Sequence, residues 1–273
     1  MIEETVRQAL RRLTAMSFLQ NVLPFLAQKK PPPPPPLGSL RIASPGDILR
    51  LGVVATAGFF YSEQFMFERP FHKNFPQDTI IFFRHEVENF VKSSEHIVLV
   101  CTDKYAPDES SKTEAIIPLD NGWEPPRAGE EVIVGLGVWK LNPGSKRVGD
   151  FQNDTAPYPD LPRYEGSDLD EERAKRIEVV AGAADHKYFD GLSTMERIVV
   201  HPAYWKRSHG STIARWGVAL ASIDGIDQGV LATTMGASLF THVGYQHISE
   251  TQVEGDERSP EGFSLAILRY RVA

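Results

Sequence analysis

The sequence contains a single cysteine, Cys101, in 273 residues. One cysteine excludes an internal disulfide framework and any zinc site built from several cysteines. The histidines supply no substitute, because His72, His85, His186 and His201 show neither an i, i+4 pair nor a ligand cluster. We therefore predict no metal site, and we expect Cys101 to belong to the core rather than to act as a nucleophile.

Long apolar runs and basic clusters are also missing. No hydrophobic run reaches the roughly twenty residues that a membrane span needs, and the net charge is −7 with no basic cluster longer than a few residues. These properties argue against nucleic acid as a partner and mildly favour a cationic amine substrate. With 41% hydrophobic and 24% charged residues, the chain is typical of a globular protein, and we expect it to be cytoplasmic without a membrane partner.

The first 39 residues differ in composition from the rest. Residues 1–30 have apolar side chains spaced three to five apart and predict a helical extension, which packs on the domain or on a second subunit of a homodimer. The six prolines Pro31–Pro36 predict a stiff linker over residues 31–39. A polyproline-binding partner is the alternative to a rigid tether.

Residues 40–273 predict one α/β domain. A strand at 40–42 precedes a helix that Ser44 and Asp47 cap reciprocally. The further predicted elements are helices at 77–93, 168–190 and 211–222 and strands at 96–101, 131–139, 198–200, 229–233, 247–253 and 263–272. Residues 103–129 are long enough to be a flap or partly disordered, and residues 142–167 form an irregular, proline-rich insert.

The most informative segment lies between Met195 and Tyr245. The short strand Ile198, Val199, Val200 is followed by a turn and by a basic, glycine-containing loop that opens a helix: Lys206, Arg207, Ser208, His209, Gly210, Ser211, Thr212. A helix start presents unpaired N–H groups and about half a positive charge, so it suits a phosphate. Gly210 lets such a phosphate approach the backbone, and Lys206 and Arg207 add cationic donors.

Two motifs in this segment resemble those of the GNAT acetyltransferase superfamily. Arg207-x-x-Gly210-x-Thr212 is similar to the Gln/Arg-x-x-Gly-x-Gly/Ala pyrophosphate loop, although Thr212 replaces glycine or alanine. The run from Gly236 to Tyr245 is similar to the closing motif of the superfamily. The proline-rich inserts and the run from His201 to Gly210 resemble those of GNAT proteins of filamentous fungi. This resemblance implies a role in specialised metabolism or detoxification.

The resemblance implies a fold, a co-substrate and a set of binding residues. The fold is a mostly antiparallel sheet with one splayed parallel pair and flanking helices, and acetyl-CoA lies in the splay. The backbone of Ile198, Val199 and Val200 would contact the pantetheine arm. The loop Lys206, Arg207, Ser208, His209, Gly210, Ser211 and Thr212 would hold the pyrophosphate.

Acetyl transfer to an amine also needs a base. We predict Glu196, eleven residues before Arg207, because histone-acetylating members of the superfamily have a base glutamate at this offset. The acid that protonates the thiolate is often a tyrosine in the closing motif, where this chain has Phe240. His242 is the second catalytic candidate, although on a helix it points about 200° away from Phe240; Tyr245 or unassisted departure of the thiolate are alternatives.

The predicted function is acetyl-CoA-dependent N-acetylation of a small-molecule amine. Two alternatives stay open. The missing tyrosine favours a GNAT-fold protein with other chemistry, such as decarboxylation, hydrolysis or rearrangement. The polyproline segment favours a non-catalytic binding protein.

Overall fold

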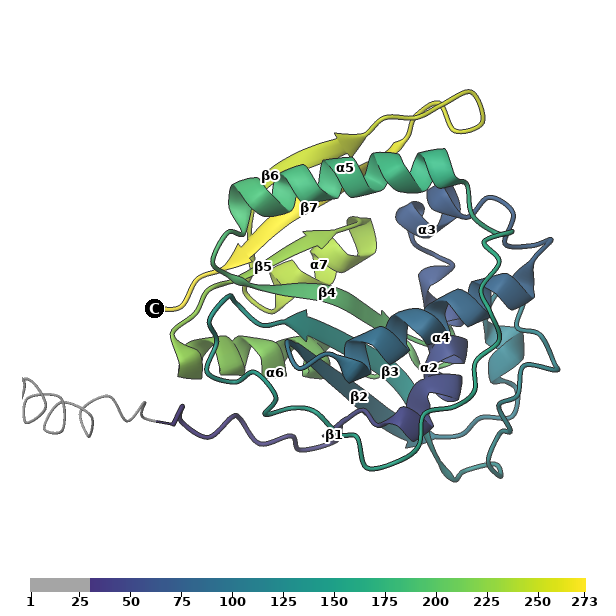
Figure 1. Cartoon of the computed structure of the whole chain (residues 1–273), viewed down its shortest axis with the longest axis horizontal. Helices are drawn as coiled ribbons and strands as arrows, with labels where there is room; N and C mark the ends of the chain where they lie inside the picture. The colour runs from purple at the N-terminus through teal and green to yellow at the C-terminus, as the bar shows by residue number, and fades with distance from the viewer. Residues whose placement is uncertain (1–29) are drawn as a thin grey trace, which may run out of the picture. The chain divides into compact units, whose positions relative to one another are not determined.

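The part of the chain that the computed structural model describes, residues 30–273, is built around one mixed sheet of seven strands (Figure 1). The strands are β1 (Leu40–Ile42), β2 (His96–Lys104), β3 (Glu131–Lys140), β4 (Ser193–Val200), β5 (Gln228–Ala232), β6 (Gln246–Val253) and β7 (Phe263–Tyr270). Their order in space is β1-β2-β3-β4-β5-β7-β6, and only β4 and β5 are parallel. The predicted fold class, a mostly antiparallel sheet with one parallel pair, is confirmed.

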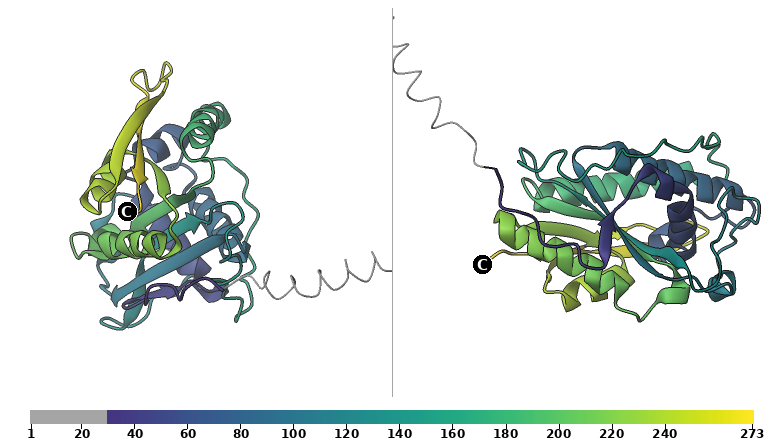
Figure 2. Two further views of the ribbon diagram at one scale, coloured as in Figure 1. Left: turned by 90° about the vertical axis from the view of Figure 1, so that its left-hand side faces the viewer. Right: turned by 90° about the horizontal axis from the view of Figure 1, so that it is seen from below.

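Helices cover both faces of this sheet. They are α2 (Ile48–Phe59), α3 (Glu63–Glu68), α4 (Pro76–Lys92), α5 (Glu171–Tyr188), α6 (His209–Asp224) and α7 (Thr234–His242). Helices α4 and α5 lie in front of the sheet in Figure 1, with α6 and α7 behind it. The hairpin of β6 and β7, yellow in Figure 2, projects beyond the rest of the sheet.

Alternating side chains explain why the sheet has a helix layer on each face. In β2, Ile97, Leu99 and Cys101 belong to the core that includes residues of α6, whereas Val98 and Val100 belong to the core under α2 and α4. This period of two is that of a strand with both faces buried. Cys101 is 2% exposed and unpaired, as the sequence predicts for a core residue.

The start of the folded unit coincides with the polyproline run. Pro33–Ala273 forms one compact unit, in which the carbonyl of Pro35 accepts a hydrogen bond from Trp216 Nε1 at 3.2 Å. The helix predicted over residues 1–30 lies outside the described residues but for Lys30. The division into extension, linker and domain stays a prediction.

The largest differences from the sequence prediction lie between the regular elements. Helix α3 has only six residues and was not predicted. Residues 103–129, expected to be a flap or partly disordered, are instead anchored to the domain: Glu109 is 4% exposed and forms a buried ion pair with Arg50 of α2. An apolar period cannot reveal such a segment, because this ion pair and hydrogen bonds such as that from Thr113 to the Ala57 carbonyl join it to distant parts of the chain.

The insert at 142–167 has neither helix nor strand, but its end is tied to the domain. The helix predicted from residue 168 starts later, because α5 begins at Glu171 and Asp170 caps it by accepting from Arg173 N–H at 3.3 Å. Asp168 is fully buried and serves as an ion-pair partner instead.

Candidate active site

Strands β4 and β5 separate in the middle of the sheet. Their parallel pairing ends at Met195 and Val230, whereas β4 continues to Val200 and β5 to Ala232. Beyond these residues β4 and β5 are no longer paired with each other, and the two strands form the sides of an opening. This is the splay that the sequence resemblance implies.

A β-bulge lies where the splay begins. Opposite β3, the register moves from Met195 directly to Arg197, so that Glu196 is the extra residue. A bulge interrupts the alternation of side chains, and here the consecutive side chains of Glu196 and Arg197 contact His96 of β2 and Glu86 of α4, respectively. The bulge therefore places a carboxylate and a guanidinium side by side at the mouth of the splay.

A cavity of about 470 Å³ opens from the splay. One part of its lining, the loop half, comes from the end of β4, the segment before α6, the first residues of α6, β5 and α7: Ile198, Val199, Val200, Tyr204, Trp205, Lys206, Ser208, His209, Gly210, Ser211, Leu231, Thr233, Met235 and Leu239. The other part, the helix half, comes from α2, α3 and α4 together with the bulge: Gly58, Phe59, Ser62, Gln64, Phe65, Glu68, Phe83, Glu86, Glu196 and Arg197.

The loop half ends in free backbone donors. Helix α6 starts after Ser208, and its first helical hydrogen bond runs from Thr212 N–H to the Ser208 carbonyl at 2.9 Å. The N–H groups of His209, Gly210 and Ser211 have no partner within residues 30–273. Three N–H groups at the positive end of a helix dipole form an anion site.

The backbone before α6 is unusual for side-chain-bearing residues. Lys206 and Ser208 adopt φ of 61° and 67°, a left-handed conformation that costs about 1–2 kcal/mol without glycine. Asp103 of β2 stabilises this conformation, because its Oδ2 lies 3.0 Å from Arg207 NH1 and 2.9 Å from His209 Nε2. Burial would raise the pKa of Asp103, but the hydrogen bonds from His209 and Arg207 outweigh it and hold the pKa below its usual value.

Arg207 and Thr212 do not line the cavity. Arg207 pairs with Asp103 and lies over the ring of Tyr204, 5.2 Å from its centroid. The hydroxyl of Thr212 donates to the Ser208 carbonyl at 2.9 Å, so this departure from the family motif supports the loop. The other predicted binding residues, Ile198, Val199, Val200, Lys206, Ser208, His209, Gly210 and Ser211, all line it.

The helix half brings together three carboxylates. Glu86 accepts from Arg197 NH2 at 2.6 Å and from Arg197 Nε at 3.1 Å. Glu196 Oε2 lies 3.2 Å from His96 Nε2. Glu68 Oε1 lies 3.5 Å from Arg69 Nε.

The pKa values of two of these carboxylates move in opposite directions. Burial alone would raise the pKa of Glu196, but the hydrogen bond and charge of His96 and the charge of Arg197 outweigh burial and lower it. Burial raises the pKa of Glu68, because the charges of Arg69 and Arg197 do not offset it. Glu196 is thus the easier of the two carboxylates to ionise.

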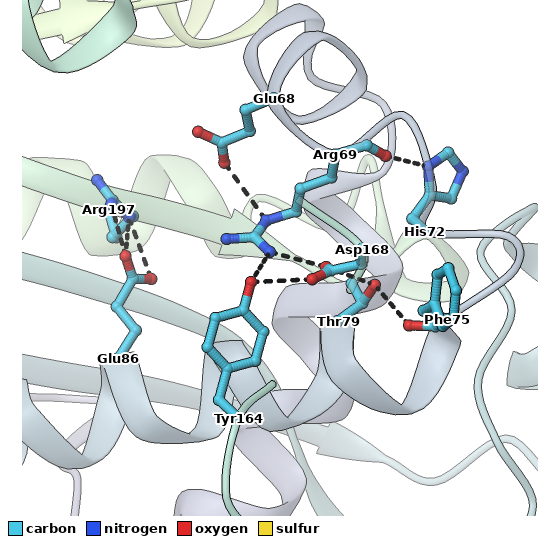
Figure 3. A network of polar contacts seen from close by, with 9 residues as sticks. All are labelled: Glu68, Arg69, His72, Phe75, Thr79, Glu86, Tyr164, Asp168 and Arg197. Carbon is cyan, nitrogen blue, oxygen red and sulfur yellow. Dashed lines mark hydrogen bonds and ion pairs between the residues drawn. The ribbon is translucent and has the colours of Figure 1, made fainter. Parts of the chain in front are cut away.

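A buried network fixes the end of α3 that carries Glu68 (Figure 3). The guanidinium of Arg69 donates to Asp168 Oδ2 at 2.7 Å and to the Tyr164 hydroxyl at 3.0 Å. Thr79 of α4 donates to the same Asp168 oxygen at 2.9 Å. The insert and α4 therefore hold α3 in place beside the cavity. Tyr164 performs this role and does not line the cavity.

A close approach of α2 to β4 completes the helix half. A Cβ at Gly58 would lie 2.8 Å from the Val200 carbonyl oxygen and would also clash with the Val199 side chain. Glycine at this position lets the end of α2 rest on the strand, which places Phe59 at the cavity.

The closing-motif residues differ in their access to the cavity. Phe240 lines it at 1% exposure, with its ring centroid 5.1 Å from that of Tyr245. The Tyr245 hydroxyl donates to Gln228 Oε1 at 2.7 Å, and burial raises its pKa, so it holds its proton in the core. His242 is exposed, lies 3.2 Å from Arg215 and is not among the lining residues. The structure therefore does not bring His242 to the other predicted residues.

Sequence reasoning missed Glu68, Glu86 and Arg197. They come from the consecutive helices α3 and α4 and from β4, which lies far from both in the chain. The sequence holds one weak signal for them: Phe65 and Glu68 are three residues apart, and so are Phe83 and Glu86.

Comparison with known proteins agrees with this geometry. The chain is 30% identical over 237 residues to an acetyltransferase of the filamentous fungus Stachybotrys chartarum, which covers 85% of this chain and 90% of that protein. The chain therefore belongs to the GNAT acetyltransferase superfamily and is an acyltransferase enzyme. No family model matches the chain.

Two solved structures are similar in fold. One is assigned as arylalkylamine N-acetyltransferase 7 of the yellow fever mosquito, with a TM-score of 0.50, 15% identity and coverage of 86% of this chain and 87% of that one. The other is described as the histone acetyltransferase HPA2 and related acetyltransferase of Corynebacterium glutamicum, with a TM-score of 0.48, 13% identity and coverage of 86% and 96%.

No helix within residues 30–273 is long and apolar enough to cross a membrane. In the same range, no group of three or more histidine, cysteine, aspartate or glutamate side chains is arranged to hold a metal ion.

Proposed function

We propose that this enzyme transfers the acetyl group of acetyl-CoA to a small-molecule amine. The observation that carries the proposal is that one continuous cavity joins the two sites. The free N–H groups of α6 lie at one end, and the carboxylates of Glu68, Glu86 and Glu196 lie at the other. A phosphate-bearing co-substrate suits the first end, and a cationic acceptor suits the second.

In this proposal the cofactor is held mainly by backbone groups. The N–H groups of His209, Gly210 and Ser211 bind the pyrophosphate, and Lys206 adds a cation. The unpaired edge of Ile198–Val200 hydrogen-bonds the pantetheine arm. Arg207 acts from outside the cavity, through Asp103 and the loop.

Glu196 is the proposed base. It takes a proton from the acceptor ammonium, directly or through a water molecule, and the neutral nitrogen then attacks the thioester carbonyl. The C–N bond forms, the C–S bond breaks, and the departing thiolate takes the second nitrogen proton. The position of Glu196 at the start of the splay supports this role, because the bulge places its carboxylate at the lining of the cavity.

The experiment that tests the proposal is a product assay with the full chain. Acetyl-CoA is incubated with a panel of small amines, and free coenzyme A and acetylated amines are measured. Glu196→Gln is expected to lower kcat by about 10²–10⁴-fold while acetyl-CoA binding is retained. Unchanged turnover in this variant across pH would remove Glu196 from the mechanism.

Phe240 favours a second candidate function, chemistry on acyl-CoA without an amine. Its ring cannot protonate a leaving thiolate. If coenzyme A is released at the same rate with and without any amine, hydrolysis or another acyl-CoA reaction replaces acetyl transfer as the conclusion.

A further inference from the structure

The helix half has a repeated pattern that the proposed acetyl transfer does not use. Helix α3 presents Phe65 and, three residues on, Glu68; helix α4 presents Phe83 and, three residues on, Glu86. Residues three apart lie on the same face of a helix, and all four line the cavity. Two consecutive helices therefore each contribute an aromatic ring next to a carboxylate.

The aromatic members form one wall. The rings of Phe65 and Phe83 stack with centroids 6.2 Å apart and an interplanar angle of 18°. Phe59 extends the wall, since its ring stacks on Phe83 at 5.4 Å and 22°. Phe59 is also less buried than the other two. Such a wall suits a flat apolar group.

The carboxylates differ in how far their charge is neutralised. Two nitrogens of Arg197 hold Glu86, and His96 contacts Glu196. Glu68 contacts Arg69 at 3.5 Å and the neutral amide of Gln64, and the charge of Arg197 also acts on it. Arg69 already makes shorter contacts to Asp168 and Tyr164. Glu68 is therefore the carboxylate of the cavity whose contact with its basic partner is the longest of the three.

We propose that Glu68 binds the ammonium group of the acceptor, whose aromatic body lies against Phe59, Phe65 and Phe83. This inference rests on the proposed acetyl transfer and names its substrate class, an aromatic primary amine. Glu68 is then a specificity-determining residue, whereas Glu196 receives the proton. The half-buried position of Glu68 supports the assignment, because a partly desolvated carboxylate that lies 3.5 Å from its cation gains from an incoming ammonium group.

A binding experiment without turnover tests the charge. The full chain, with coenzyme A present, is titrated with 2-phenylethylamine and with its neutral analogue 2-phenylethanol. We expect the wild type to bind the amine about 10- to 100-fold more tightly than the alcohol. Glu68→Gln should reduce this preference to about one. Glu178→Gln, an exposed position on α5 outside the cavity lining, is the matched control and should keep it.

Two further measurements distinguish the contribution of the aromatic wall from that of the Glu68 charge. Phe59→Leu should weaken the amine and the alcohol by the same factor and leave their ratio unchanged. In the acetylation assay, Glu68→Gln should raise KM for 2-phenylethylamine by about tenfold or more with little change in kcat, whereas Glu196→Gln should lower kcat. Thermal unfolding of each variant establishes that it is folded.

The proposal is overturned by any of three results. The wild type fails to prefer the amine over the alcohol, Glu68→Gln keeps the preference, or 1,4-diaminobutane is a better acceptor than 2-phenylethylamine. A wild type that does not bind acetyl-CoA at all instead refutes the proposed function, and titration with acetyl-CoA alone distinguishes that failure.

Discussion

The loop half and the helix half of the cavity recognise their ligands by different means. The loop half offers backbone N–H groups from one continuous segment, His209 to Ser211, after left-handed residues. The helix half offers side chains from three helices and a bulge, with Glu68, Glu86 and Glu196 as its charges. Backbone donors suit a co-substrate that does not change, whereas side chains can vary without altering the fold. We infer that acceptor choice resides in the helix half.

The largest expected effect comes from breaking the support of the helix half. Arg69→Met leaves the fully buried carboxyl group of Asp168 without its cation, which should cost about 3–5 kcal/mol of unfolding free energy. Denaturant unfolding at neutral pH measures it. Arg163→Met, which loses only an exposed pair with Glu165, should cost at most about 1 kcal/mol. Equal losses would contradict the assigned role of the buried network.

The next effect sharpens the role of the loop half. Asp103→Asn weakens the contacts to Arg207 and His209, and the loop should then sample conformations that cannot bind phosphate. We expect acetyl-CoA affinity to fall by about tenfold, or 1.4 kcal/mol, with the melting temperature little changed. Asp108→Asn, which loses an exposed pair with Lys112, is the control. An unaltered affinity in Asp103→Asn would show that the loop holds its shape alone.

A smaller effect tests the strain in the same loop. Ser208→Gly removes the steric cost of a φ of 67° and should stabilise the protein by up to about 1 kcal/mol. Ala219→Gly puts the same residue inside helix α6 and should destabilise by about 1 kcal/mol. Chemical unfolding of both variants checks the sign. A loss of stability in Ser208→Gly would contradict the strained conformation.

The smallest effect concerns pH and the helix half. The pKa of Glu68 is raised above its ordinary value of 4.5, so its ionised form destabilises the folded state at any pH above the folded pKa. Glu68→Gln should therefore raise the melting temperature at pH 7, and the gain should vanish as the pH falls below about 4. The control Glu178→Gln should stay within about 0.5 kcal/mol of the wild type. A gain in melting temperature that does not depend on pH would contradict the raised pKa of Glu68.

The same contrast explains what could be predicted from the sequence. The loop half lies on about fifty consecutive residues, so the strand, the loop and helix α6 were readable from local pattern. Helix α3 has too few residues to show an apolar period. Glu68, Glu86 and Arg197 meet only through tertiary packing, and the shared Phe-x-x-Glu spacing of α3 and α4 does not by itself show that the two helices line one cavity.

Asp168 shows the limit most clearly. The sequence pattern predicts that a helix begins at Asp168, yet this residue lies before α5 and pairs with Arg69, which lies 99 positions earlier. Similarly, His242 shares helix α7 with Phe240, but only Phe240 lines the cavity. Which face of a helix meets a cavity depends on the packing of its neighbours.

The measurement that tests the central claim most directly is calorimetric titration with acetyl-CoA of the wild type, Gly210→Asp, Glu68→Gln and Glu196→Gln. There is room for a small side chain at Gly210, since a Cβ would meet Leu239 only at 3.5 Å, so an aspartate there opposes the pyrophosphate without breaking the fold. We expect micromolar binding by the wild type and by both glutamate variants, and its loss in Gly210→Asp. Binding that survives in Gly210→Asp, or is absent from the wild type, would contradict an acetyl-CoA site in the loop half.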